Sequence, residues 1–156
     1  MDIMEVQCRR AESQDVESLY KLIQTYAEKG IMLPRSEEML AEMIDTFVVA
    51  VADGHIVGCG SLCKLGQDLV EVRSLGISDG YKGEGIGRKI VDQLVELAKL
   101  SNYSKVMALT YEVAFFEKVG FSIVPKDIFP EKVWRDCMNC PKQYCCDEIA
   151  VMKRLN

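Results

Sequence analysis

The spacing of hydrophobic positions predicts two helices in the first third of the chain. From Ser13, a candidate N-cap, apolar residues recur at intervals of three and four, and Gly30 marks the end of this helix. A second, shorter helix is expected after Ser36, because acidic residues occupy its first turn. The apolar positions are Val16, Leu19, Tyr20, Ile23, Tyr26 and Ala27 in the first helix and Met39, Leu40, Met43 and Ile44 in the second.

The middle of the chain changes to the pattern of strands. Runs of β-branched residues flank Asp53-Gly54, a pair that favours a tight type I′ turn, and predict antiparallel strands over 47–53 and 55–65. A third strand of this meander is expected over 68–77. The remaining predicted elements are strands within 4–10 and over 105–110, 121–125 and 148–153, and helices over 86–100 and 112–120.

This order of elements predicts an α/β (α+β) fold. We expect a mixed, mainly antiparallel central sheet of about six to seven strands, flanked by about four helices. No repeat or linker divides the sequence, so we expect one domain over residues 1–156. A chain of 156 residues, of which 49% are hydrophobic, is long enough to bury a substantial core.

Charge and cysteine content narrow the class of protein. The net charge of −5 argues against a nucleic-acid partner, because the phosphate backbone favours a basic surplus. No apolar run reaches the roughly 18 residues of a membrane span, and no export signal is visible, so we expect a cytoplasmic protein without a membrane partner. Seven cysteines, an odd number, are expected to be mostly reduced thiols. A homodimer is compatible with the sequence.

The stretch GYKGEGIGRK, residues 80–89, carries four glycines immediately before the predicted helix 86–100. Glycine allows positive φ and close approach of a ligand to the backbone. Because the turn opens a helix, its free N–H groups and the helix dipole predict a phosphate or pyrophosphate site. Lys82, Arg88 and Lys89 add local cations. The alternative is a glycine-rich turn that binds no ligand.

Two common phosphate motifs do not fit this stretch. The Walker pattern requires Gly-Lys-Ser/Thr, whereas Gly85 is followed by Ile-Gly-Arg. A dinucleotide fingerprint that starts at Gly83 would need a glycine where Arg88 stands.

The segment from Lys82 to Gly87 resembles the acyl-CoA pyrophosphate loop of the GNAT superfamily of N-acetyltransferases, although Lys82 replaces the usual Arg or Gln. The resemblance extends over most of the chain, to AFFEKVGF at 114–121. It implies that acetyl-CoA is the cosubstrate and that its pantetheine arm pairs with the end of strand 68–77. The coenzyme-binding residues that it implies are Leu75, Gly76, Ile77, Lys82, Gly83, Glu84, Gly85, Ile86, Gly87 and Arg88.

The chemistry of acetyl transfer requires a neutral amine, so a base must accept a proton. Glu71 is a lone carboxylate in an apolar strand, at the position where several family members carry a glutamate base. The alternative is a side chain that points to solvent. Phe116 stands where many relatives carry a tyrosine acid, so the donor to the departing thiolate is not assigned. By resemblance, the Leu75 amide polarises the thioester carbonyl.

The stretch from Gly30 to Cys59 resembles the acetyltransferase domain of bacterial N-acetylglutamate synthases. This implies L-glutamate as the acceptor, within arginine biosynthesis. Arg35 and Arg73 are candidate clamps for its carboxylates, because guanidinium can bind a carboxylate through two hydrogen bonds. Each could instead be a surface residue. Two alternatives stay open: transfer to another amine (another amino acid, a polyamine or a protein N-terminus), or a non-catalytic acyl-CoA sensor.

A cysteine cluster lies in an irregular insertion expected at about 136–147. Its four thiols, Cys137, Cys140, Cys145 and Cys146, have the spacing C-x2-C-x4-C-C. A structural metal or a redox-sensitive clip is one interpretation, but adjacent cysteines seldom both reach one metal. We therefore expect reduced thiols and no metal site.

Overall fold

The computed structural model describes residues 6–30, 34–125 and 149–155. These residues form two compact units. The first comprises Met1–Leu62 and Val72–Glu96, and the second comprises Cys63–Glu71 and Leu97–Asn156. The second unit therefore holds the first three residues of strand β4, and the first unit holds the rest of that strand.

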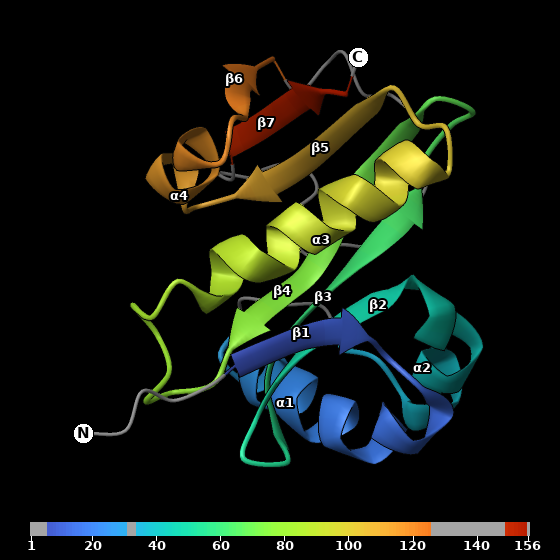
Figure 1. The fold of residues 1–156 in the computed structure, drawn as a ribbon, viewed down its shortest axis with the longest axis vertical. Coiled ribbons are helices and arrows are strands. Elements are labelled where there is room, and N and C mark those ends of the chain that lie inside the picture. The colour runs from blue at the N-terminus through green and yellow to red at the C-terminus, as the bar shows by residue number, and fades with distance from the viewer. Residues whose placement is uncertain (1–5, 31–33, 126–148, 156) are drawn as a thin grey trace. The chain divides into compact units, whose positions relative to one another are not determined.

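Within the described ranges, seven strands form a sheet with the hydrogen-bonded order β1-β2-β3-β4-β5-β7-β6 (Figure 1). Pairing is antiparallel for β1 with β2, β2 with β3, β5 with β7 and β6 with β7, and parallel for β4 with β5. The predicted mixed, mainly antiparallel sheet is confirmed. The strands are β1 Val6–Arg10, β2 Phe47–Ala52, β3 His55–Lys64, β4 Leu69–Ile77, β5 Lys105–Thr110, β6 Ser122–Val124 and β7 Ile149–Arg154.

The described residues contain four α-helices, in agreement with the prediction. They are α1 Val16–Glu28, α2 Glu37–Met43, α3 Ile86–Leu100 and α4 Val113–Lys118. Short 3-10 turns precede α1 at Ser13–Asp15 and follow α2 at Ile44–Thr46. No helix among the described residues is long and apolar enough to cross a membrane.

The predicted start of α1 is wrong, whereas that of α2 is confirmed. Asp15 accepts the Glu12 N–H at 2.7 Å, which closes a 3-10 turn that includes Ser13, and the α-helix begins only at Val16. Ser36 caps α2, because its hydroxyl accepts the Met39 N–H at 3.1 Å.

The apolar face predicted for α2 is only partly correct. Leu40 is fully buried, as expected from the periodicity. Met39 is 41% exposed, because the next position of a helix points about 100° away from the buried one. Ile44 lies beyond the helix, in the 3-10 turn that leads into β2.

In the first unit, β2 and β3 lie between two helical layers. Leu19 and Ile23 of α1 and Leu40 of α2 form one buried cluster with Phe47, Val49 and Cys59 of the strands. Figure 1 shows α1 and α2 close together within this unit. Since side chains alternate along a strand, these residues define one face of β2 and β3.

Helix α3 packs on the opposite face of β3 and needs two glycines there. A Cβ on Gly60 would lie 2.9 Å from Ile90 Cγ2 and 3.0 Å from Leu94 Cδ1, and a Cβ on Gly58 would lie 3.0 Å from Ile90 Cδ1. Glycine in β3 is therefore what allows the backbone of this strand to approach the α3 side chains so closely.

The β2–β3 turn has the conformation that its sequence predicts. Asp53 and Gly54 have φ of 51° and 78°, which are the two positive values of a type I′ turn. The pairing of β2 with β3 also contains an irregularity between Ala50 and Val51.

The second unit has its own apolar clusters. Leu65, Leu69, Met107 and Ala150 form a buried group around β5 and β7. The ring of Phe116 in α4 packs edge-to-face on Phe121, with ring centroids 5.1 Å apart. Phe116 is 4% exposed, so this aromatic residue is a core residue of the unit.

Candidate active site

The glycine turn joins β4 to α3 within the first unit. Gly80, Gly83 and Gly85 have φ of 93°, 83° and 79°, so each occupies a conformation that is strained for other residues. A Cβ built on any of the three would have no atom within 4 Å. Packing therefore does not require glycine here, whereas the backbone conformation does.

The turn ends where the unsatisfied N–H groups of α3 begin. The first bond of the helix runs from the Lys89 N–H to the Gly85 carbonyl at 3.3 Å, so the preceding N–H groups at 85–88 have no acceptor in the preceding helical turn. Ile86, 2% exposed, anchors the helix start in the core. Such a helix start suits an anion such as a diphosphate.

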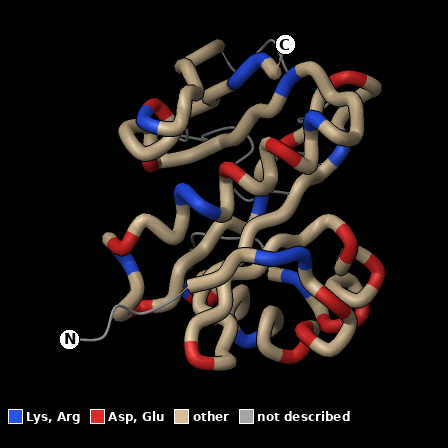
Figure 2. The backbone as a smooth tube through the Cα atoms, in the orientation of Figure 1, with Lys and Arg blue, Asp and Glu red and all other residues tan. Residues whose placement is uncertain are grey.

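The turn carries charges of both signs (Figure 2). Lys82 and Arg88 are exposed and lie within ion-pairing distance of acidic neighbours, Lys82 Nζ 3.5 Å from Asp79 and Arg88 Nε 4.0 Å from Asp92. The Tyr26 phenol and then the Asp79 carboxylate raise the pKa of Lys82 from its ordinary value. Exposed ion pairs of this kind are weak, and both cations can turn to a ligand.

The end of β4 departs from regular strand geometry at Ser74, whose φ is 54°. Two side chains from the neighbouring strand β3 hold the carbonyls at this point. The Ser61 hydroxyl donates to the Arg73 carbonyl and the Cys59 thiol donates to the Ser74 carbonyl, both at 3.2 Å. Burial raises the pKa of the Cys59 thiol to about 12, so the thiol keeps the proton that it donates.

Ile77, the last residue of β4, is bonded by a side chain from α1. The Tyr26 hydroxyl donates to the Ile77 carbonyl and accepts the Ile77 N–H at 3.0 Å. The ring of Tyr26 lies beneath two ammonium groups, Lys82 at 5.5 Å and Lys29 at 5.9 Å from its centroid. Tyr26 thereby links α1, the end of β4 and the glycine turn.

Both candidate clamp arginines belong to the first unit. Arg35 lies just before α2, and Arg73 lies in β4 beside the irregular Ser74. Each is half-buried.

Glu71, the candidate base, belongs to the second unit. It lies in the part of β4 that pairs in parallel with β5, opposite Met107, and it is 2% exposed. The alternative in which its side chain points to solvent is wrong. In the same unit, the hydroxyl-bearing Tyr111 is 46% exposed at the end of β5.

The cysteine cluster at 137–146 lies outside the described residues. Within the described ranges, no group of three or more His, Cys, Asp or Glu side chains could hold a metal ion. Among the described cysteines, Cys8, Cys59 and Cys63 are free thiols.

Sequence reasoning missed the supports of this site. Tyr26 was assigned only to the apolar face of α1, and Cys59 and Ser61 only to a strand. Their roles depend on contacts with β4, which lies more than ten residues away in the sequence. The periodicity of a single segment carries no signal for such contacts.

Comparison with known sequences gives one family for most of the chain. Residues 14–121 match the Acetyltransferase (GNAT) family. An uncharacterized N-acetyltransferase of Chlorobaculum tepidum is 37% identical over 94% of this chain and 95% of its own length. An amino-acid acetyltransferase of Mycobacterium tuberculosis is 38% identical over 73% of this chain and 67% of its own length.

Solved structures agree with this result. N-acetylglutamate synthase from Neisseria gonorrhoeae, complexed with coenzyme A and N-acetyl-glutamate, superposes with a TM-score of 0.84 at 26% identity. The match covers 99% of this chain but 36% of the synthase chain, so the similarity concerns only part of that enzyme. A Mycobacterium tuberculosis protein in complex with coenzyme A has a TM-score of 0.81 at 30% identity, and the match covers 96% of this chain and 99% of that one.

Proposed function

Since the chain belongs to the GNAT family of acetyltransferases, we propose that it transfers the acetyl group of acetyl-CoA to the α-amine of L-glutamate. Acetyl-CoA-dependent N-acetyl transfer follows from the family and from the relatives. The choice of glutamate is the proposed part. It is supported by the named amino-acid acetyltransferases and by the synthase whose structure resembles this chain.

The observation that supports acetyl-CoA binding in this proposal is the start of α3. Three glycines with positive φ and open space at their Cβ positions lead directly into the unsatisfied N–H groups of the helix. We propose that the amides of Gly83, Gly85, Gly87 and Arg88 hold the diphosphate of acetyl-CoA, with Lys82 as a further cation. Glu84 and Ile86 complete this loop.

The end of β4 is proposed to hold the pantetheine arm. An extended chain can add to a strand edge through backbone hydrogen bonds. Leu75, Gly76 and Ile77 supply the N–H and carbonyl groups for such pairing. The Leu75 N–H is proposed to bond the thioester carbonyl, where negative charge develops during transfer.

Glu71 is proposed as the general base. Its carboxylate takes the proton from the substrate ammonium, so that the nitrogen lone pair can attack the thioester carbon. The new C–N bond forms, the nitrogen of the adduct loses its second proton, the C–S bond breaks, and the sulfur leaves as a thiolate that must gain a proton. Phe116 cannot give that proton, because its phenyl ring carries no hydroxyl group.

Arg35 and Arg73 are proposed to bind the two carboxylates of glutamate. A guanidinium–carboxylate pair makes two charge-assisted hydrogen bonds, so the arginine that binds the side-chain carboxylate favours an acidic amino acid over a neutral one. Arg35→Ala is expected to raise the KM for glutamate about tenfold or more, with little change in the KM for acetyl-CoA. Lys21→Ala, an exposed substitution on α1, is the control.

A panel of free amino acids tests the acceptor. Release of the coenzyme A thiol is measured with each amino acid, with a polyamine and with a peptide N-terminus. The proposal expects glutamate to give the highest kcat/KM. If another amine gives the highest kcat/KM, acetyl transfer stands but glutamate is not the acceptor. If no amine releases the thiol, both acetyl transfer and the choice of glutamate are contradicted.

A further inference from the structure

The Tyr26 hydroxyl makes the two hydrogen bonds that a neighbouring strand would make to Ile77. It donates to the Ile77 carbonyl and accepts the Ile77 N–H at 3.0 Å. In an antiparallel pair, a hydrogen-bonded residue likewise exchanges both its N–H and its carbonyl with the residue opposite. One side chain of α1 therefore occupies a complete pairing position of β4.

This pairing position lies on the edge of β4 that faces away from β3. The next residue, Ser78, donates its N–H to the Val57 carbonyl of β3 at 2.8 Å. Successive residues of an extended chain direct their backbone groups to opposite edges. The N–H and carbonyl of Ile77 thus point to the edge where an added extended chain would bind.

We propose that Tyr26 is a placeholder for the coenzyme: its hydroxyl holds the pairing groups of Ile77 in the free protein, and a pantetheine amide displaces it on binding. This inference rests on the proposed function, because it requires the pantetheine arm to pair with Ile77. The coenzyme must then break the two hydrogen bonds of the Tyr26 hydroxyl, so loss of this hydroxyl lowers the cost of binding.

The surroundings of the Tyr26 ring connect this displacement to the anion site. Lys29 and Lys82 both lie over the ring, and both approach the Asp79 carboxylate, at 3.8 and 3.5 Å. A diphosphate that attracts Lys82 withdraws one of the two cations that face the ring. Binding at the glycine turn and release of the hydroxyl therefore favour each other.

Calorimetry with two ligands distinguishes an effect of the Tyr26 hydroxyl on pantetheine binding from an effect on diphosphate binding. Coenzyme A carries both a diphosphate and a pantetheine arm, whereas ADP carries only a diphosphate. Tyr26→Phe removes the hydroxyl and keeps the ring under Lys29 and Lys82. We expect the Kd for coenzyme A to fall about three- to tenfold in Tyr26→Phe, as competing hydrogen bonds are removed, and the Kd for ADP to fall by a clearly smaller factor.

Tyr20→Phe is the matched control, since this residue lies on the same helix and packs beside the buried cluster of α1. Neither Kd is expected to change in this variant. An unchanged or higher Kd for coenzyme A in Tyr26→Phe overturns the placeholder, and so does an equal fall for both ligands. If the wild-type protein binds no coenzyme A, the proposed function itself fails, which is a different result.

Hydrogen exchange of the Ile77 amide gives a second measurement that is independent of affinity. In the free protein, Tyr26→Phe should accelerate this exchange, because the amide loses its acceptor. Saturating coenzyme A should protect the amide equally in wild type and variant. Unchanged exchange in the free variant contradicts the inference.

Discussion

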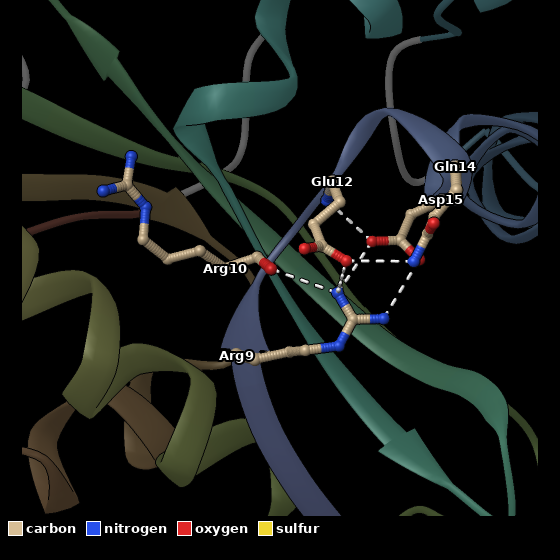
Figure 3. A network of polar contacts seen from close by, with 5 residues as sticks. All are labelled: Arg9, Arg10, Glu12, Gln14 and Asp15. Carbon is tan, nitrogen blue, oxygen red and sulfur yellow. Dashed lines mark hydrogen bonds and ion pairs between the residues drawn. The ribbon is translucent and has the colours of Figure 1, made fainter.

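The Arg9 guanidinium holds the Asp15 carboxylate through two parallel hydrogen bonds, Nη1 to Oδ2 at 2.8 Å and Nη2 to Oδ1 at 3.1 Å (Figure 3). The same carboxylate accepts the Glu12 N–H at 2.7 Å. Arg9 lies in β1 and Asp15 directly precedes α1, so the pair fixes the entry of the first helix. The Asp15 side chain is 8% exposed, whereas that of Arg9 is 39% exposed.

Arg9→Ala is expected to destabilise the protein by about 1–3 kcal/mol. The value lies between those for an exposed ion pair and for a buried one, because only the carboxylate is buried. Urea unfolding measures the change. The control is Lys21→Ala, which removes an exposed pair with Glu17 and should cost less than about 0.5 kcal/mol. Equal effects of the two substitutions would contradict the assigned role.

The contribution of Asp15 should depend on pH in the acid range. Its hydrogen bonds with Arg9 are the main cause that lowers the pKa of Asp15 from its ordinary value of 3.8. A depressed carboxyl pKa stabilises the folded state fully above the ordinary value, and this stability is lost as the pH falls through the folded-state pKa. Urea midpoints of wild type and Arg9→Ala should therefore differ at pH 6 and converge only as the pH falls below 3.8 and through the folded-state pKa. A constant difference would exclude this linkage.

Gly85→Ala should weaken coenzyme A binding about tenfold or more. The backbone at Gly85 has φ of 79°, which costs a non-glycine residue roughly 1–2 kcal/mol, so the amides at the start of α3 should reorient. Gly30→Ala is the matched control, since Gly30 has φ of 73° and equally open space at its Cβ position. Calorimetry should show a raised Kd for Gly85→Ala only. A similar Kd in both variants would remove the glycine turn from the binding site.

Glu71→Gln tests the base without changing the shape of the buried side chain. We expect kcat to fall about 100-fold or more, because general base catalysis contributes roughly 10²–10⁴. The Kd for coenzyme A should stay near the wild-type value. The exposed Glu117→Gln in α4 is the control and should leave both quantities unchanged. A near-normal kcat in Glu71→Gln would assign the proton transfer to another group.

Gly60→Ala should destabilise the first unit by about 1–3 kcal/mol through overpacking. The added Cβ would lie 2.9 Å from Ile90 Cγ2. Because Ile90 is fully buried, its side chain has little room to move away. A double-mutant cycle with Ile90→Ala checks the cause, because the second substitution removes the atom in closest contact. Gly60→Ala should cost less in the Ile90→Ala background than in the wild type. If urea unfolding shows that the effects of the two substitutions are additive, the contact with Ile90 is not the source of the strain.

Local sequence features predicted most elements of the fold. Apolar spacing predicted helices α1, α2 and α3, and Asp53-Gly54 predicted the turn of the hairpin, because these signals depend on residues close in sequence. The predicted start of α1 was wrong, since the Asp15 carboxylate accepts two hydrogen bonds from Arg9 of the preceding strand and the α-helix begins after it. When an ion pair with another element determines where a helix starts, the sequence of the helix alone does not show that start.

For the candidate site, the sequence alone determined the glycine turn, the family resemblance and the carboxylate in β4. Only the tertiary structure decided that Glu71 is buried, that Ser61 and Cys59 hold the irregular end of β4, and that Tyr26 bonds Ile77. Glycines in the sequence predict a turn with positive φ, because their conformational freedom is a local property. Burial and long-range hydrogen bonds depend on which segments the fold brings together, and no single segment records that.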